Sequence, residues 1–80
     1  MKDRNKIITQ LLIFAENYGI EIININFTII NSIMEEVEFV FKIEQNKFTI
    51  KYLYEKGNMY DVNSAGCYIK YKLVELLEEE

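Results

Sequence analysis

The strongest constraint on the fold is a pair of alternating apolar runs between Met34 and Tyr54. In the first run the odd positions are apolar and charged residues fill most positions between them: Val37, Phe39, Phe41 and Ile43. After residues 45–47 the parity changes, and the even positions become apolar: Phe48, Ile50, Tyr52 and Tyr54. Alternation with a period of two is typical of strands with one buried face. Two antiparallel strands, at about 36–44 and 47–54, gain one wholly apolar side when Ile43 faces Phe48 and Val37 faces Tyr54.

A third alternating run lies upstream and predicts another strand at about 22–30. Pairing Ile29 with Val37 brings the apolar faces of the two strands into agreement, and residues 31–35 form the connecting loop. Ile20 and Ile22 have the opposite parity to the rest of the run. This change of parity predicts a bend or bulge where the chain enters the strand.

Two helices flank these strands. The first, at about 3–18, buries residues spaced by three and four and ends before Gly19: Ile7, Ile8, Leu11, Leu12, Ala15 and Tyr18. The second, at about 64–78, is capped by Asn63 or Ser64 and buries Gly66, Ile69, Leu73, Leu76 and Leu77. Residues 55–62 form a turn, followed by a short fourth strand or a loop. The predicted fold is α+β, a two-layer sandwich of order α-β-β-β-α with both helices on the apolar face of an antiparallel sheet.

Composition narrows the class of protein. Eighty residues with 14% aromatic content predict one small folded domain, residues 1–80. No apolar run approaches the ~18 residues that a membrane-spanning helix needs, and no signal-peptide pattern is present. A single cysteine fits a reducing compartment, so we expect a cytoplasmic protein. The net charge of -4 and scattered basic residues disfavour nucleic acid as a partner.

The residues needed for common enzyme chemistry are missing, so we expect no enzyme, no cofactor and no metal. The chain has no histidine, which removes the commonest general base and metal ligand. Cys67 has no imidazole partner, although a place near a helix start leaves a reactive thiol as an alternative. Glu35, Glu36 and Glu38 are expected to form a solvated strand edge rather than a metal site.

Surface aromatic and acidic residues instead predict a protein-binding surface, because tyrosine suits interfaces with one dry and one wet side. The candidate contacts for a larger partner with a basic surface are Glu36, Glu38, Tyr60, Asp61, Tyr68, Glu78, Glu79 and Glu80. Three apolar residues fall on the outer side of the expected sheet: Ile30, Val40 and Leu53. These three, or an unpaired strand edge, could join two copies into a homodimer.

The order of elements resembles the double-stranded-RNA-binding domain. Residues 11–19 look like the end of its first helix, residues 37–49 like its second strand and turn, and residues 64–77 like its second helix, with Gly66 as a small residue close to the sheet. The family's lysine-rich entry to the second helix is replaced here by residues 63–67, Asn-Ser-Ala-Gly-Cys. Without that phosphate contact, the resemblance implies the fold and a different use of it.

The sequence therefore predicts a small, acidic, non-catalytic module that acts by occluding a surface of a larger protein. In size and charge it is similar in type to phage-encoded inhibitors of bacterial defence, including anti-CRISPR proteins, which would place it in the cytoplasm of a host cell. The alternative is a divergent nucleic-acid-binding module of the resembled fold, for which Lys70 and Lys72 are the candidate contacts.

Overall fold

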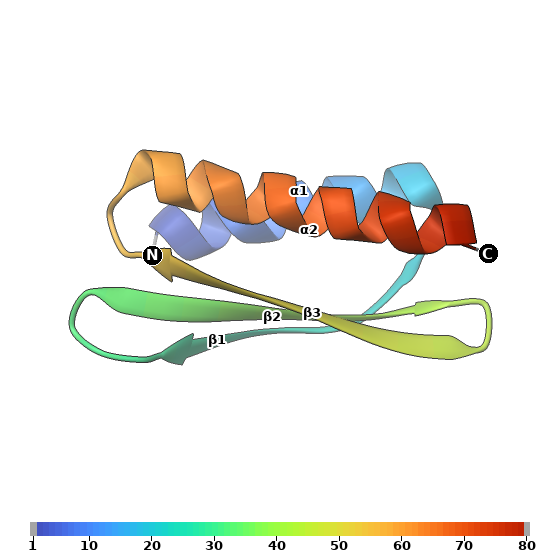
Figure 1. The fold of residues 1–80 in the computed structure, drawn as a ribbon, viewed down its shortest axis with the longest axis horizontal. Coiled ribbons are helices and arrows are strands. Elements are labelled where there is room, and N and C mark those ends of the chain that lie inside the picture. Colours follow the sequence, from blue (N-terminus) through green and yellow to red (C-terminus); the bar gives the residue numbers. More distant parts are fainter. Residues whose placement is uncertain (1, 80) are drawn as a thin grey trace.

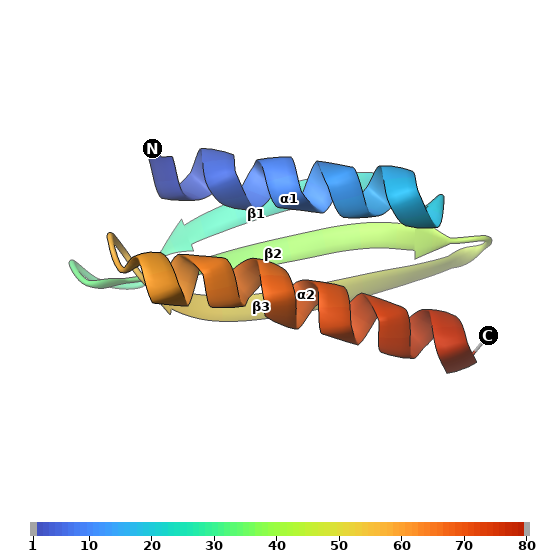
Figure 2. The same cartoon turned by 90° about the horizontal axis from the view of Figure 1, so that it is seen from above.

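The computed structural model describes residues 2–79 and confirms the predicted α+β class. Two helices lie side by side on one face of a three-stranded antiparallel sheet of order β1-β2-β3 (Figures 1 and 2). In chain order the elements are α1 (Lys2–Tyr18), β1 (Glu21–Ile29), β2 (Met34–Ile43), β3 (Asn46–Glu55) and α2 (Met59–Glu79). Neither helix has the length and apolar character needed to cross a bilayer within the described residues.

The turn between β2 and β3 is tighter than the sequence suggested. Ile43 pairs with Asn46, so only Glu44 and Gln45 form the turn, and Glu44 takes a positive φ of 58°. Consequently Phe41 faces Phe48, a register two residues away from the predicted pairing of Ile43 with Phe48. A shift of two residues keeps every side chain on its original face, so alternation alone could not detect it.

The β1–β2 pairing shows the same displacement together with the expected bulge. Phe27, not Ile29, faces Val37, and the register shifts between Ile22 and Asn24. Ile23 is the additional residue and is 42% exposed, so its predicted place on the buried face was wrong. The bulge changes the parity of the chain, as the run beginning at Ile20 had indicated.

A side-chain bond explains why β2 begins earlier than predicted. The Asn31 side-chain oxygen accepts the N–H groups of Ile33 and Met34 at 2.8 and 2.7 Å. This short polar turn closes the hairpin, so Met34 and Glu35 already belong to β2.

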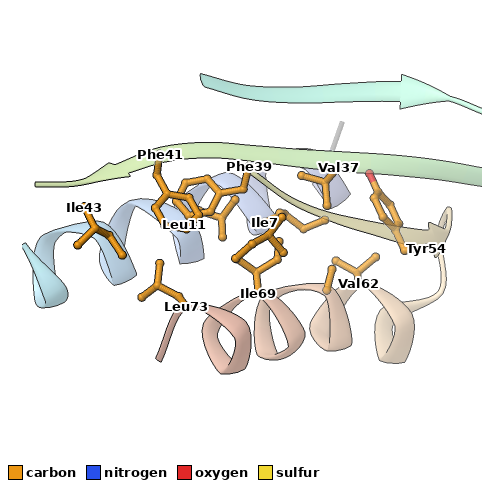
Figure 3. Close-up of a cluster of buried hydrophobic side chains, with 12 residues drawn as sticks. Ile7, Leu11, Val37, Phe39, Phe41, Ile43, Tyr54, Val62, Ile69 and Leu73 are labelled. Atoms are coloured by element: carbon orange, nitrogen blue, oxygen red, sulfur yellow. The ribbon is translucent and has the colours of Figure 1, made fainter. Parts of the chain in front are cut away.

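The core lies between the helices and the inner face of the sheet (Figure 3). β2 contributes the most buried side chains, because it is the central strand and has a neighbour on each side. The rings of Phe39 and Phe41 stack with centroids 4.8 Å apart. The fully buried residues are Ile7, Leu11, Val37, Phe39, Phe41, Tyr54, Val62, Ala65, Ile69 and Leu73.

α2 begins five residues before the predicted start, and residues 59–62 are neither a strand nor a loop. The Asn58 side-chain oxygen accepts the N–H groups of Tyr60 and Asp61 at 3.1 and 3.2 Å, which makes Asn58 the N-cap. Val62 is fully buried in the first turn. Asn63 and Ser64, the predicted caps, are exposed residues inside the helix.

Gly66 allows α1 and α2 to approach each other, rather than bringing α2 close to the sheet as expected from the resemblance. A Cβ atom at Gly66 would lie 2.0 Å from Oε1 of Gln10 on α1 and 2.8 Å from its Cδ. That oxygen is buried and has no hydrogen-bond partner among the described residues. The end of the Gln10 side chain thus occupies the space that a Cβ atom at residue 66 would need.

This contact predicts that substitutions at Gly66 and Gln10 are coupled. Gly66→Ala should be less favourable in the wild-type background than in Gln10→Ala, by up to about 1 kcal/mol, because only the wild-type background has the Gln10 side chain that the new Cβ must displace. In Gln10→Ala the same change should stabilise, since alanine exceeds glycine in helix propensity by about 1 kcal/mol. Urea unfolding of the four proteins gives the coupling energy, and additive effects would contradict the contact.

Candidate functional site

The solvent side of α2 carries three tyrosines, Tyr60, Tyr68 and Tyr71, which we call the α2 tyrosine surface. Their side chains are 87%, 39% and 62% exposed. The helical period of 3.6 residues places them on the same side of α2. The opposite side of α2 is committed to the core through Val62, Ala65, Ile69 and Leu73. The tyrosines therefore cannot rotate inward without exposing the core.

Neighbouring side chains hold part of this surface in place. Lys72 Nζ lies 5.7 Å from the ring centroid of Tyr68 and 5.9 Å from that of Tyr71. Tyr68 also packs on Tyr52 of β3, with centroids 5.1 Å apart. Glu75, three residues further along α2, forms an ion pair with Lys72, with its Oε1 3.6 Å from Nζ. Such contacts order the rings before any partner arrives, which reduces the entropic cost of binding.

The predicted partner contacts in the first turns of α2 have different roles. Tyr60 and Tyr68 belong to the α2 tyrosine surface. Asp61 is half-buried, and its carboxylate accepts the backbone N–H of Glu55 at the end of β3. Asp61 therefore fastens the start of α2 to the sheet, a role that the sequence interpretation did not foresee.

The predicted acidic contacts lie in two separate places. Glu36 and Glu38 lie on the outer face of the sheet, opposite the helices. Glu38 already accepts a hydrogen bond from Asn26 at 2.9 Å and lies 3.8 Å from Lys51 Nζ. At the other end of α2, Glu78 and Glu79 are exposed, and Glu80 lies outside the described residues. The candidates thus do not form one continuous site.

The predicted homodimer patch of Ile30, Val40 and Leu53 is not formed as expected. Ile30 and Leu53 are 50% and 47% exposed, but Val40 is only 8% exposed. Val40 lies on the central strand, where Asn24 and Thr49 flank it on the neighbouring strands. Leu53 faces Glu36, and Ile30 bonds to Met34, whereas Val40 lies two outward-facing positions beyond Glu36 on β2. The three residues therefore form no continuous apolar surface.

A buried polar network that sequence reasoning missed joins α1 to the sheet. Glu35 is 4% exposed and accepts two bonds from Arg4, Nε to Oε2 at 3.0 Å and Nη2 to Oε1 at 2.7 Å. The Tyr54 hydroxyl donates to the same Oε2. The Arg4 guanidinium holds the pKa of Glu35 below its usual value. Burial and the neighbouring carboxylate raise the pKa of the Tyr54 hydroxyl, so it remains a donor.

This network adjoins a pocket of about 390 Å³ in which the Asp3 and Glu35 carboxylates are already engaged. The pocket is lined by Lys2, Asp3, Arg4, Ile29, Glu35 and Lys56. Each Glu35 oxygen already accepts a hydrogen bond, and Oδ2 of Asp3 accepts the Gly57 N–H at 2.7 Å. We interpret these residues as a structural joint between α1, the β2–β3 hairpin and the turn before α2. The true register, which brings Glu35 opposite Tyr54, was the signal that could have revealed it.

Cys67 is exposed and lies well past the first turn of α2, where the effect of the helix dipole has faded. Within residues 2–79, no three histidine, cysteine, aspartate or glutamate side chains are grouped so that they could hold a metal ion. Neither observation assigns a chemical role to these residues.

The α2 tyrosine surface is thus the feature of the described chain that most needs a functional explanation. Comparison with known proteins supplies none: no protein-family model, curated protein or solved structure that was compared with this chain matches it.

Proposed function

We propose that this protein is a non-catalytic binding module that occupies a surface of a larger protein through the α2 tyrosine surface. The observation that carries the proposal is the exposure of three tyrosines on one side of a helix whose other side is fixed in the core. Tyrosine is enriched among the few residues that contribute most of the energy of protein interfaces.

The charges around this surface indicate the chemistry of the partner. Glu75, Glu78 and Glu79 continue along α2 beyond the tyrosines, and the whole chain has a net charge of -4. A partner should therefore offer apolar pockets for the rings, with basic residues where the end of α2 would lie. Opposite charges at the rim of an interface mainly accelerate association. That the partner is a bacterial defence protein remains a prediction from the resemblance to phage inhibitors.

The proposal predicts that substitutions of Tyr60 and Tyr71 abolish binding without affecting folding. Tagged wild type, Tyr60→Ala, Tyr71→Ala and the control Thr49→Ala would be used to capture proteins from a lysate of the encoding organism. Thr49 is exposed on the outer face of the sheet, away from α2. A partner should be lost with either tyrosine variant and kept with Thr49→Ala. With the purified partner, each tyrosine substitution should weaken Kd by about 30-fold, which corresponds to about 2 kcal/mol.

Two results would contradict this proposal. In the first, every captured protein binds the tyrosine variants as well as the wild type. In the second, the chain binds duplex RNA in a gel shift, binding weakens steeply with salt, and Lys70→Glu and Lys72→Glu abolish it. That second result would favour the nucleic-acid-binding alternative, because a steep salt dependence is typical of phosphate contacts. Lys70 lies over the ring of Phe14, and Lys72 lies over the rings of Tyr68 and Tyr71.

A further inference from the structure

The two edges of the sheet differ in how they resist pairing with another strand. β1 and β3 are the edges, because β2 lies between them. β3 carries Lys47, Lys51 and Glu55 on its outer side, and α2 packs along it. β1 is nine residues long and has a single charged residue, Glu21, at its beginning. Natural edge strands are commonly protected by charges or proline, and most of β1 has neither.

The backbone of β1 directs free hydrogen-bonding groups toward solvent. The Ile25 N–H bonds to the side-chain oxygen of its neighbour Asn24 at 2.9 Å, whereas the Ile30 N–H bonds to Met34 at the start of β2. Because the N–H groups along an edge strand alternate in direction, those of Ile25, Phe27 and Ile29 face the open edge. A pairing strand could accept from Phe27 and Ile29, and it would replace the Asn24 oxygen as the acceptor for Ile25.

Exposed apolar side chains border this edge. Ile23 and Ile29 are 42% and 63% exposed, and Leu12 of α1 is 53% exposed. Arg4 of α1 lies over the Phe27 ring of β1 at 5.2 Å, so α1 runs beside this edge. Figure 2 shows α1 above β1, yet Ile29 stays more than half exposed.

We propose that β1 pairs antiparallel with β1 of a second copy about a two-fold axis, which would give a continuous six-stranded sheet. Antiparallel pairing centred on Asn26 sets Ile25 opposite Phe27 of the second copy on the inner side. On the outer side the same pairing sets Asn24 opposite Thr28. Apolar groups thus meet apolar groups and uncharged polar groups meet each other, which an isologous contact requires.

Charge also favours a second copy at this edge. Two chains with a net charge of -4 each repel one another, so a stable contact must avoid opposing like charges. The stretch from Ile22 to Ile29 has no charged residue, so copies that meet here set no like charges opposite one another along it. The corresponding pairing of two β3 strands would bring lysines close to lysines. α2 lies over β3, so the paired form would leave both α2 tyrosine surfaces open (Figure 2).

The test compares Ile29→Lys with Leu53→Lys, two exposed aliphatic residues on opposite edge strands. Sedimentation equilibrium from 1 to about 500 µM should show a concentration-dependent dimer for the wild type. Ile29→Lys should weaken dimerisation at least about 10-fold, and Leu53→Lys should leave it unchanged. Thermal unfolding of the dilute variants confirms that both fold. Amide hydrogen exchange of Ile25, Phe27 and Ile29 should slow as wild-type concentration rises.

Three outcomes would overturn the pairing of two copies. In the first, the wild type remains monomeric at every concentration tested. The same conclusion holds if the β1 amides exchange more slowly only after a different protein is added. Leu53→Lys could dissociate the dimer as strongly as Ile29→Lys. Finally, a dimer could form without slower exchange at the β1 amides. Tyr60→Ala changes α2 and leaves β1 intact. The effect of Tyr60→Ala on partner binding therefore tests the proposed function separately from the pairing of β1 strands.

Discussion

Replacing Phe39 with alanine is expected to lower the free energy of unfolding by about 3–5 kcal/mol. Phe39 is fully buried at the centre of β2, faces Ile25 and Ile50 on the two neighbouring strands, and stacks on Phe41 (Figure 3). The substitution removes a ring that helices and sheet enclose together, leaving a cavity that the rigid strands cannot close. A chain of this length has about 4–12 kcal/mol of stability in total. The variant should therefore be close to unfolding at room temperature.

Urea unfolding followed by circular dichroism measures this effect, with two variants for comparison. Phe39→Leu retains most of the buried volume and should cost less than about 1.5 kcal/mol. Thr49→Ala, on the outer face, should change stability by no more than about 0.5 kcal/mol. If Phe39→Ala matched Thr49→Ala, the position of the core between β2 and the helices would be wrong.

Glu35→Gln is expected to cost about 2 kcal/mol at neutral pH, because it replaces the charged acceptor of a buried network. The glutamine carbonyl oxygen can still accept hydrogen bonds, but the NH2 group cannot accept from Arg4 and the amide carries no charge for the guanidinium. Tyr54 can still donate to the amide oxygen, so the variant should fold. Tyr54→Phe removes the hydroxyl and leaves the Arg4 pair intact, and its cost should be smaller.

The cost of Glu35→Gln should depend on pH in a defined direction. Arg4 lowers the pKa of Glu35 in the folded chain below the ordinary value of 4.5. A lowered folded pKa contributes stability that is complete above the unfolded pKa and is lost as pH falls through the folded pKa. The difference between wild type and Glu35→Gln should be constant from pH 6 to 8 and shrink below about pH 4.5. A constant difference down to pH 2.5 would show that the pKa of Glu35 is the same in the folded and unfolded chain, so that Arg4 does not lower it.

The fold class was predictable because the apolar alternation was strong. Phe39, Phe41 and Ile50 lie on the buried face, as expected, and the parity change near Ile22 correctly indicated a bulge. These predictions depend only on which face a side chain occupies. Period-two alternation determines the face and is insensitive to errors of two residues in pairing.

The details that sequence reasoning missed depend on single polar contacts. The side-chain oxygens of Asn31 and Asn58 determine where β2 and α2 begin, yet asparagine in a turn has no unique partner in the sequence. The Arg4–Glu35 pair joins residues 31 positions apart, so it appears only when the register and the helix position are both known. Glu35 shares the odd parity of the buried positions of β2, but the predicted loop at residues 31–35 left it outside the strand.

The candidate site was predictable in part. Tyr60 and Tyr68 were chosen as tyrosines near the loop at residues 55–63, and both lie on the exposed side of α2. Tyr71 was not chosen, although the predicted helix at 64–78 contained it, because the alignment of Tyr60 with the other two requires a helix that begins at Met59. Asp61 and Val40 are less exposed than expected, because Asp61 bonds to the end of β3 and Val40 lies on the central strand.

The order of strands in the sheet has a consequence for how this chain reaches its folded state. Each strand pairs with its neighbour in sequence, so both hairpins close short loops and lose little chain entropy before their first contacts form. The first and last elements of the chain, α1 and α2, pack against each other, so this contact joins residues far apart in the sequence. The meander can therefore act as a local nucleus, and docking of the terminal helices against it would be the slow, entropically demanding step of folding.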